Sequence, residues 1–262
     1  LRDYLAGGGR LLVSGQDVAY LDGGGLAFWG LVFPYLRDQM SVDYRADHGP
    51  LRVQGADLYG GLELDLSGEG GANNQVSPDI VGAHDPERGA LVWHYDGGSG
   101  AGVAADVCVP WRSLFFSFGF EAIAERSARA EVLDRSVEWL MTAPVTAGLK
   151  LTPLTPQVLV GRPGETLTHE VSVRHIGYAG VTETVTLTVS DADWPTAAIS
   201  QSVELGPCTS ERVVVTTTIP ADVGMDQLGY APLAAQTNLL TAPVTVSLAS
   251  KTPAPVLLVD DD

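Results

Sequence analysis

The sequence predicts an α/β three-layer domain, incomplete at its N-terminus, followed by an all-β immunoglobulin-like sandwich. Residues 1–17 are typical of a helix end, a glycine cap and a short apolar strand. An apolar segment over 113–120 precedes a helical pattern over 121–141, which indicates a buried strand and a helix that covers the sheet. From residue 151 onward apolar and polar residues alternate, with turn clusters at the spacing of a sandwich.

The domain boundaries follow from breaks in these patterns. Pro144 and Gly148 interrupt the helical pattern and predict a linker. We therefore assign 1–146 to the truncated α/β domain, 147–250 to the sandwich, and 251–262 to a linker and an isolated strand. That strand would belong to a following α/β domain or complete the first one.

The last residues suggest how an incomplete sheet could be repaired. Residues 255–262 read Pro-Val-Leu-Leu-Val-Asp-Asp-Asp, which is typical of the first strand of an α/β sheet. We expect the chain to be a piece of a longer polypeptide. An apolar strand in water favours pairing with a sheet edge, such as 11–13 in the same chain or in a neighbour. The residues of the predicted strand-exchange dimer are Val256, Leu257, Leu258 and Val259.

The charge balance excludes some partners. The 262 residues include 32 acidic and 15 basic side chains, for a net charge of −17. Such a surface repels nucleic-acid phosphates, so we expect no nucleic-acid ligand. No apolar run approaches the roughly 20 residues that span a bilayer, so we expect no membrane insertion. Cys108 and Cys208 lie in different predicted domains; two buried thiols are favoured over a disulfide.

Two resemblances extend these predictions. Residues 4–17 and 118–123, with a helix carrying Arg129, Arg135 and Trp139, resemble the class I glutamine amidotransferase-like fold in its degenerate, non-amidotransferase versions. This implies a flavodoxin/amidotransferase-like layer arrangement, and the chain's last residues resemble the strand missing from its front.

The second resemblance covers the β region. Gly-Glu-Thr at 164–166, Asp-Trp-Pro at 193–195, Glu-Leu-Gly-Pro at 204–207 and the alternating segment 213–220 resemble NEW3/CARDB-type immunoglobulin-like modules. These modules occur in large secreted bacterial proteins, some with subtilisin-like or immune-inhibitor-A-like peptidase domains. The resemblance implies a secreted or cell-surface bacterial multidomain protein, with a peptidase as the candidate parent.

Ser14 is the one catalytic candidate. It occupies the strand-to-helix turn where the resemblance implies a nucleophilic cysteine. A serine needs an adjacent base, and the segment 118–123 offers only Glu121 instead of a His-x-Glu pair. We therefore favour a structural turn. Histidines followed or preceded by an aspartate are alternative bases, among them the pair Asp47–His48, but solvated loops are the favoured interpretation.

Other side chains are candidates for binding. Gln16 and Asp17 follow the same turn, and Trp194 precedes a proline at a turn, where it could face a ligand. A glycine-rich acidic loop favours calcium over other metals, although its spacing is not an EF-hand. Its candidate ligands are Asp65, Glu69, Asn73 and Asp79. No other cofactor is expected. Residues 256–262 also resemble the opening of a phospho-acceptor receiver domain, which implies that the acidic residues 260–262 would bind magnesium; this alternative is less favoured.

Together these features favour a non-catalytic accessory or structural region of a large exported multidomain protein. Its expected partners are the other domains of the same polypeptide. The first alternative is a module that binds a glycan or a protein. The second is a diverged hydrolase whose site is completed by residues outside this chain.

Overall fold

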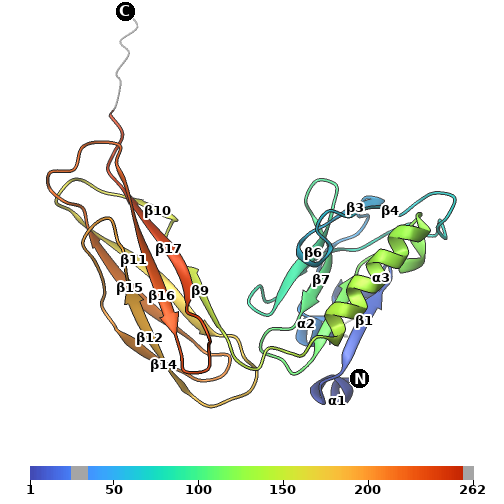
Figure 1. Ribbon diagram of the computed structural model, residues 1–262. Coiled ribbons are helices and arrows are strands. Elements are labelled where there is room, and N and C mark those ends of the chain that lie inside the picture. Colours follow the sequence, from blue (N-terminus) through green and yellow to red (C-terminus); the bar gives the residue numbers. More distant parts are fainter. Residues whose placement is uncertain (25–34, 256–262) are drawn as a thin grey trace, which may run out of the picture. The chain divides into compact units, whose positions relative to one another are not determined.

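The computed structural model describes residues 1–24 and 35–255 (Figure 1). The chain divides into two compact units, Leu1–Val145 (unit 1) and Thr146–Asp262 (unit 2). Among the described residues, no helix has the length and apolar character required to cross a membrane. The predicted exchange strand 256–259 lies outside the described residues.

Unit 1 is built around one sheet of eight strands. The strands are β1 (Arg10–Ser14), β2 (Val42–Ala46), β3 (Arg52–Gly55), β4 (Glu63–Asp65), β5 (Ile80–Ala83), β6 (Gly89–Tyr95), β7 (Gly100–Ala105) and β8 (Arg112–Phe116). Their order is β1-β8-β7-β6-β3-β4, and β5 joins β2 to β7. The described helices are α1 (Arg2–Ala6), α2 (Tyr35–Met40) and α3 (Arg126–Met141), with a π-helical turn at Tyr20–Gly24 and 3-10 turns at Asp57–Tyr59 and Phe120–Ala122.

The predicted α/β three-layer fold is wrong. Among the described strands of unit 1 only β1 and β8 run parallel, and the other pairs are antiparallel. A doubly wound fold requires a helical crossover between successive parallel strands. Here strands such as β6 and β7 are instead joined by a short turn, as in a hairpin. The described residues therefore form a largely antiparallel sheet with few helices.

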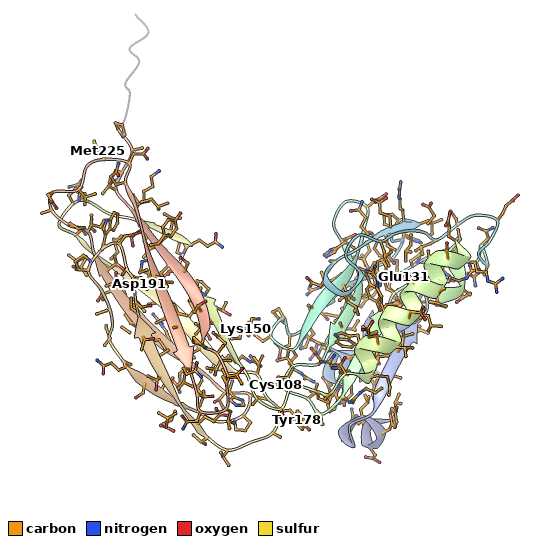
Figure 2. All side chains as sticks on the ribbon, in the orientation of Figure 1. Cys108, Glu131, Lys150, Tyr178, Asp191 and Met225 are labelled. Atoms are coloured by element: carbon orange, nitrogen blue, oxygen red, sulfur yellow. The ribbon has the colours of Figure 1, made fainter. Side chains whose placement is uncertain are left out.

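Helix α3 covers one face of this sheet (Figure 1). Its buried residues Val132, Ser136 and Leu140 recur every four positions and so form one stripe along the helix. Within the core, the Ser136 and Tyr59 hydroxyls form a hydrogen bond with 2.6 Å between their oxygens. On the solvent side, Glu131, labelled in Figure 2, pairs with Arg135 at 2.7 Å. The apolar stripe thus determines which side of α3 faces the sheet.

The alternation of β8 divides the core of unit 1 into two clusters. Leu114 and Phe116 join the cluster under α3, whereas Phe115 packs on the opposite face with Leu36 and Met40 of α2. Successive residues of a strand point to opposite faces, so burial of all three requires that both faces are covered. This explains why Leu114, Phe115 and Phe116 are consecutive apolar residues.

Unit 2 is an immunoglobulin-like β-sandwich. Its strands are β9 (Leu149–Pro153), β10 (Val158–Val160), β11 (Thr166–His175), β12 (Glu183–Val189), β13 (Thr196–Ala198), β14 (Ser202–Leu205), β15 (Ser210–Thr218), β16 (Leu228–Gln236) and β17 (Val244–Lys251). One sheet has the order β13-β15-β11-β9 and the other β10-β17-β16-β12-β14. In chain order the first corresponds to D-E-B-A, and the second contains G-F-C, as in immunoglobulin domains.

The period-two pattern of the sequence produces the core of unit 2. In β11 the side chains of Leu167, His169, Val171, Val173 and His175 are buried, and the intervening ones are not. The inward residues of the two sheets meet in one apolar cluster. Figure 2 shows side chains filling the space between these sheets. The alternation that the sequence shows beyond residue 151 is thus observed in β11.

Candidate functional site

Three loops of unit 1 bring three carboxylates together. Asp17 follows β1, Asp47 follows β2, and Asp79 precedes β5. Each offers a carboxylate oxygen within 4.8 Å of the other two. We call these residues the carboxylate cluster.

The pairing of β2 with β5 positions two members of the cluster. These strands are antiparallel, and Ala46 at the end of β2 is opposite Ile80 at the start of β5. The next residue along β2 therefore adjoins the residue that precedes β5, which places Asp47 beside Asp79. A backbone hydrogen bond of 2.8 Å from Gly49 N–H to the Pro78 carbonyl fixes the two loops to each other.

Asp79 also holds the segment that follows β1. Its side chain is 0% exposed, and its Oδ2 accepts hydrogen bonds from the Ala19 and Tyr20 amides at 2.8 and 3.2 Å. These N–H groups begin a helical turn and have no partner within it, so the carboxylate satisfies them as a cap would. Asp17 lies in the same turn with φ of 61°, a conformation that aspartate tolerates better than most residues.

Burial raises the pKa of Asp79 to about 6. The amide hydrogen bonds from Tyr20 and Ala19 lower the pKa of Asp79 in part, and the nearby charges of Asp17 and Asp47 raise it further. Within the described chain, none of the three carboxylates forms an ion pair with Arg, Lys or His. The cluster is therefore a concentration of negative charge without a compensating cation from the described residues.

The Ser14 hydroxyl is fully engaged with the backbone. It donates to the Phe118 carbonyl at 2.8 Å and accepts from the Phe120 amide at 2.7 Å. A nucleophilic serine would instead direct its single O–H proton to a general base. The observed geometry ties the end of β1 to the segment after β8, which is a structural role.

The sequence candidate Gln16 connects the end of β1 to a second loop. Its Oε1 accepts from the Val76 and Ser77 amides at 2.8 and 3.2 Å, and its Nε2 donates to the Asn74 carbonyl at 3.2 Å. A single amide side chain thus makes three hydrogen bonds to the loop backbone at 74–77. The side chain of Gln16 is therefore held in one orientation.

The same loop is fastened to the 3-10 turn after β8. Asn74 Nδ2 donates to Glu121 Oε1 at 3.0 Å, and Gln75 Oε1 accepts from the Gly119 amide at 2.9 Å. Gln75 Nε2 also donates to Asn74 Oδ1 at 3.0 Å. We call Gln16, Asn74, Gln75 and Glu121 the polar platform. Asn74 and Glu121 are exposed within it, so donors and acceptors of a preformed network face solvent.

The other three calcium candidates are Asp65, Glu69 and Asn73, and their contacts differ from those of Asp79. Asp65 on β4 is 3.8 Å from Arg52, and Glu69 is exposed. The Asn73 side chain bonds to both the amide and the carbonyl of Gly68, at 2.7 and 3.1 Å. In the described chain the structure thus groups Asp79 with Asp17 and Asp47, and it uses Asn73 to close its own loop.

Trp194 packs inside unit 2. It is 8% exposed and clusters with Leu167 and Ile219. A Cβ added at Gly229 of β16 would lie 2.6 Å from its indole ring. The absence of a side chain at Gly229 therefore allows this close approach, and Trp194 presents little surface to a ligand.

We expect Gly229→Ala to destabilise unit 2 by about 1–3 kcal/mol, because the methyl group would overlap the Trp194 ring. Gly224→Ala is the matched control, since a Cβ there has no neighbour within 4 Å among the described residues. Thermal unfolding of both variants measures the difference. Equal stabilities would contradict the packing of Trp194 against β16.

In the sequence, Asp17 was a candidate ligand contact, and Asp79 was part of an acidic loop. Asp47 was of interest only beside His48. The three are 30 and 32 residues apart in sequence, and no local spacing relates them. The pairing of β2 with β5 could have revealed the cluster, but the sequence did not predict that pairing.

Comparisons with known proteins give limited information. No protein-family model and no curated protein matches the chain. Solved structures that resemble part of it include a family 123 glycoside hydrolase from Clostridium perfringens, with 11% identity over 42% of this chain and a TM-score of 0.32. The match spans only 28% of that hydrolase.

Two other solved structures are similar to a comparable degree. A CARDB domain from Pyrococcus furiosus has 13% identity over 41% of this chain and 89% of its own, with a TM-score of 0.29. The other is a protein from Bacteroides ovatus that is provisionally named as carbohydrate-binding. It has 9% identity over 37% of this chain and 34% of its own, with a TM-score of 0.30. At these TM-scores the likenesses carry no argument about function. The immunoglobulin-like fold of unit 2 rests on its own strand order.

Proposed function

We propose that this chain is a non-catalytic accessory region of a larger exported protein and that the polar platform of unit 1 binds a carbohydrate. The observation that carries the proposal is the preformed hydrogen-bond network that holds Gln16, Asn74 and Gln75 against three loops. Loops fixed on a sheet are the usual location of binding residues. The immunoglobulin-like fold of unit 2 supports the exported setting, since such sandwiches recur in cell-surface proteins.

The chemistry of the platform favours a ligand rich in hydroxyl groups. Its side chains are three amides and one carboxylate, which together offer both donors and acceptors. A sugar presents the complementary pattern of hydroxyls. Because the side chains are already oriented, binding costs less conformational entropy. The net charge of −17 disfavours polyanionic ligands.

The contacts of Ser14 support the absence of catalysis. Its proton is donated to a backbone carbonyl, and its oxygen accepts from a backbone amide. Serine chemistry at this turn would require both bonds to break and a base to approach.

A glycan array with the labelled full chain, in buffer containing calcium chloride, tests the proposal, and calorimetry gives the affinity for any sugar retained. We expect Asn74→Ala to weaken that affinity at least tenfold, because it removes two hydrogen bonds of the platform. Asn238→Ala is the matched control: it removes an exposed asparagine from unit 2 and should leave the affinity within about twofold.

Three outcomes would contradict the proposal. An array without a retained sugar would exclude the carbohydrate, as would equal losses of affinity in the two variants. Hydrolase turnover that disappears in Ser14→Ala would show that the turn after β1 is catalytic.

A further inference from the structure

The carboxylate cluster has the dimensions of a cation site. Oxygens of Asp17, Asp47 and Asp79 lie within 4.8 Å of one another. Calcium binds oxygen at about 2.3–2.6 Å, so two ligands on opposite sides of the ion are about 5 Å apart. One ion therefore fits among the three carboxylates with little movement of the loops.

Two buried oxygens of the cluster have no hydrogen-bond partner. The Asp79 side chain is 0% exposed; its Oδ2 receives both amide hydrogen bonds, whereas its Oδ1 has no partner in the described part of the chain. Asp47 Oδ1 is likewise shielded from solvent and lacks a partner there. A buried carboxylate oxygen without a donor or a cation is costly. In both residues, therefore, one buried carboxylate oxygen has neither a hydrogen-bond donor nor a cation beside it in the described structure.

We propose that Asp17, Asp47 and Asp79 bind a divalent cation, with calcium as the preferred ion. The donor set consists of carboxylates alone, which suits hard cations and disfavours zinc or copper. The ligands come from three separate loops, and calcium tolerates irregular coordination better than magnesium does.

The ion would join the segment after β1 to the loops after β2 and before β5. Asp17 follows Gln16 directly, and Asp79 closes the loop that carries Asn74 and Gln75. Cation binding would thus stabilise the base of the polar platform. The proposed cation site depends on the carboxylate cluster and not on the proposed carbohydrate. Failure of one proposal therefore does not contradict the other.

Calcium and magnesium titrations of the full chain, first treated with a chelator, test the inference without any sugar present. We expect calorimetry to give a calcium Kd of about 10⁻⁴–10⁻³ M and weaker magnesium binding. Saturating calcium should raise the Tm of unit 1 by about 5 °C, because the ion binds only the folded state. Terbium provides a local signal, because nearby tyrosines sensitise its emission. Tyr20 adjoins the cluster, since its amide donates to Asp79, and its ring centroid is 5.7 Å from that of Tyr44.

Asp79→Asn and Asp47→Asn should each abolish the calcium-induced rise in Tm and the tyrosine-sensitised terbium emission. Asp134→Asn removes the same charge from an exposed position of α3 and should leave both unchanged. Glu69→Gln should also leave both unchanged, which separates this cluster from the other calcium candidates Asp65, Glu69 and Asn73. The unfolding transition of each variant in chelator confirms that it is folded.

The inference is overturned if calcium does not stabilise the wild-type chain. It is also overturned if Asp79→Asn and Asp134→Asn respond equally to calcium, because the ion would then bind only to the acidic surface. Loss of the response in Glu69→Gln, with the response kept in Asp79→Asn, would assign the site to residues 65–73 and would equally exclude the cluster.

Discussion

Trp93→Ala is expected to lower the free energy of unfolding of unit 1 by about 3–5 kcal/mol. Trp93 is 0% exposed and stacks on Tyr59 with 4.5 Å between ring centroids. It also forms edge-to-face contacts with Phe116 and Phe118, with ring centroids 6.2 and 6.1 Å apart. Truncation would remove all three ring contacts and leave a cavity between the sheet and α3, where backbone strands limit collapse.

Trp93→Phe is the matched control. It keeps an aromatic ring and removes an indole N–H that has no partner among the described residues, so we expect a much smaller loss than for alanine. Denaturant unfolding followed by tryptophan fluorescence and circular dichroism measures both variants. A loss below about 1 kcal/mol for Trp93→Ala would show that this aromatic cluster is not the centre of the core.

The local patterns predicted strands better than they predicted the sheet of unit 1. The short apolar strand expected within residues 1–17 is confirmed as β1, which pairs in parallel with β8. However, β7 is buried along its whole length although it is antiparallel to both neighbours. Its glycines explain this burial, because Gly102 makes room for Trp93 and Gly100 for Leu91. Burial on both faces of a strand is therefore not by itself an indicator of a parallel α/β sheet.

Unit 2 was more predictable because one face of each strand is buried and the other is solvated. The alternation in β11 follows directly from this asymmetry. The carboxylate cluster was not predictable in the same way. Its members are local to three different loops, and only the register of β2 against β5 brings Asp47 to Asp79. Long-range strand pairing leaves no periodic signal in a single sequence.

Asp79→Asn is expected to stabilise unit 1 at neutral pH in the presence of a chelator, by up to about 3 kcal/mol. The pKa of Asp79 rises from 3.8 to about 6 on folding, mainly through burial. Below about pH 4 the carboxyl is protonated in both states and contributes no difference. As the pH rises towards 6, the unfolded chain loses its proton first, so the stability of the wild type falls. Above that pH the penalty is constant.

Asparagine removes this penalty while its amide oxygen can still accept from Ala19 and Tyr20, and its N–H₂ group can donate towards Asp17 and Asp47. The stability difference between variant and wild type should therefore be largest at pH 7–8 and approach zero near pH 4. Chemical denaturation across this range measures it, with Asp134→Asn as the exposed control. Because the wild type needs the ionised carboxylate to bind calcium, adding calcium should shrink or reverse the advantage of the variant. A variant less stable than the wild type at pH 7 in chelator would mean that the Asp79 carboxylate already has a compensating positive partner.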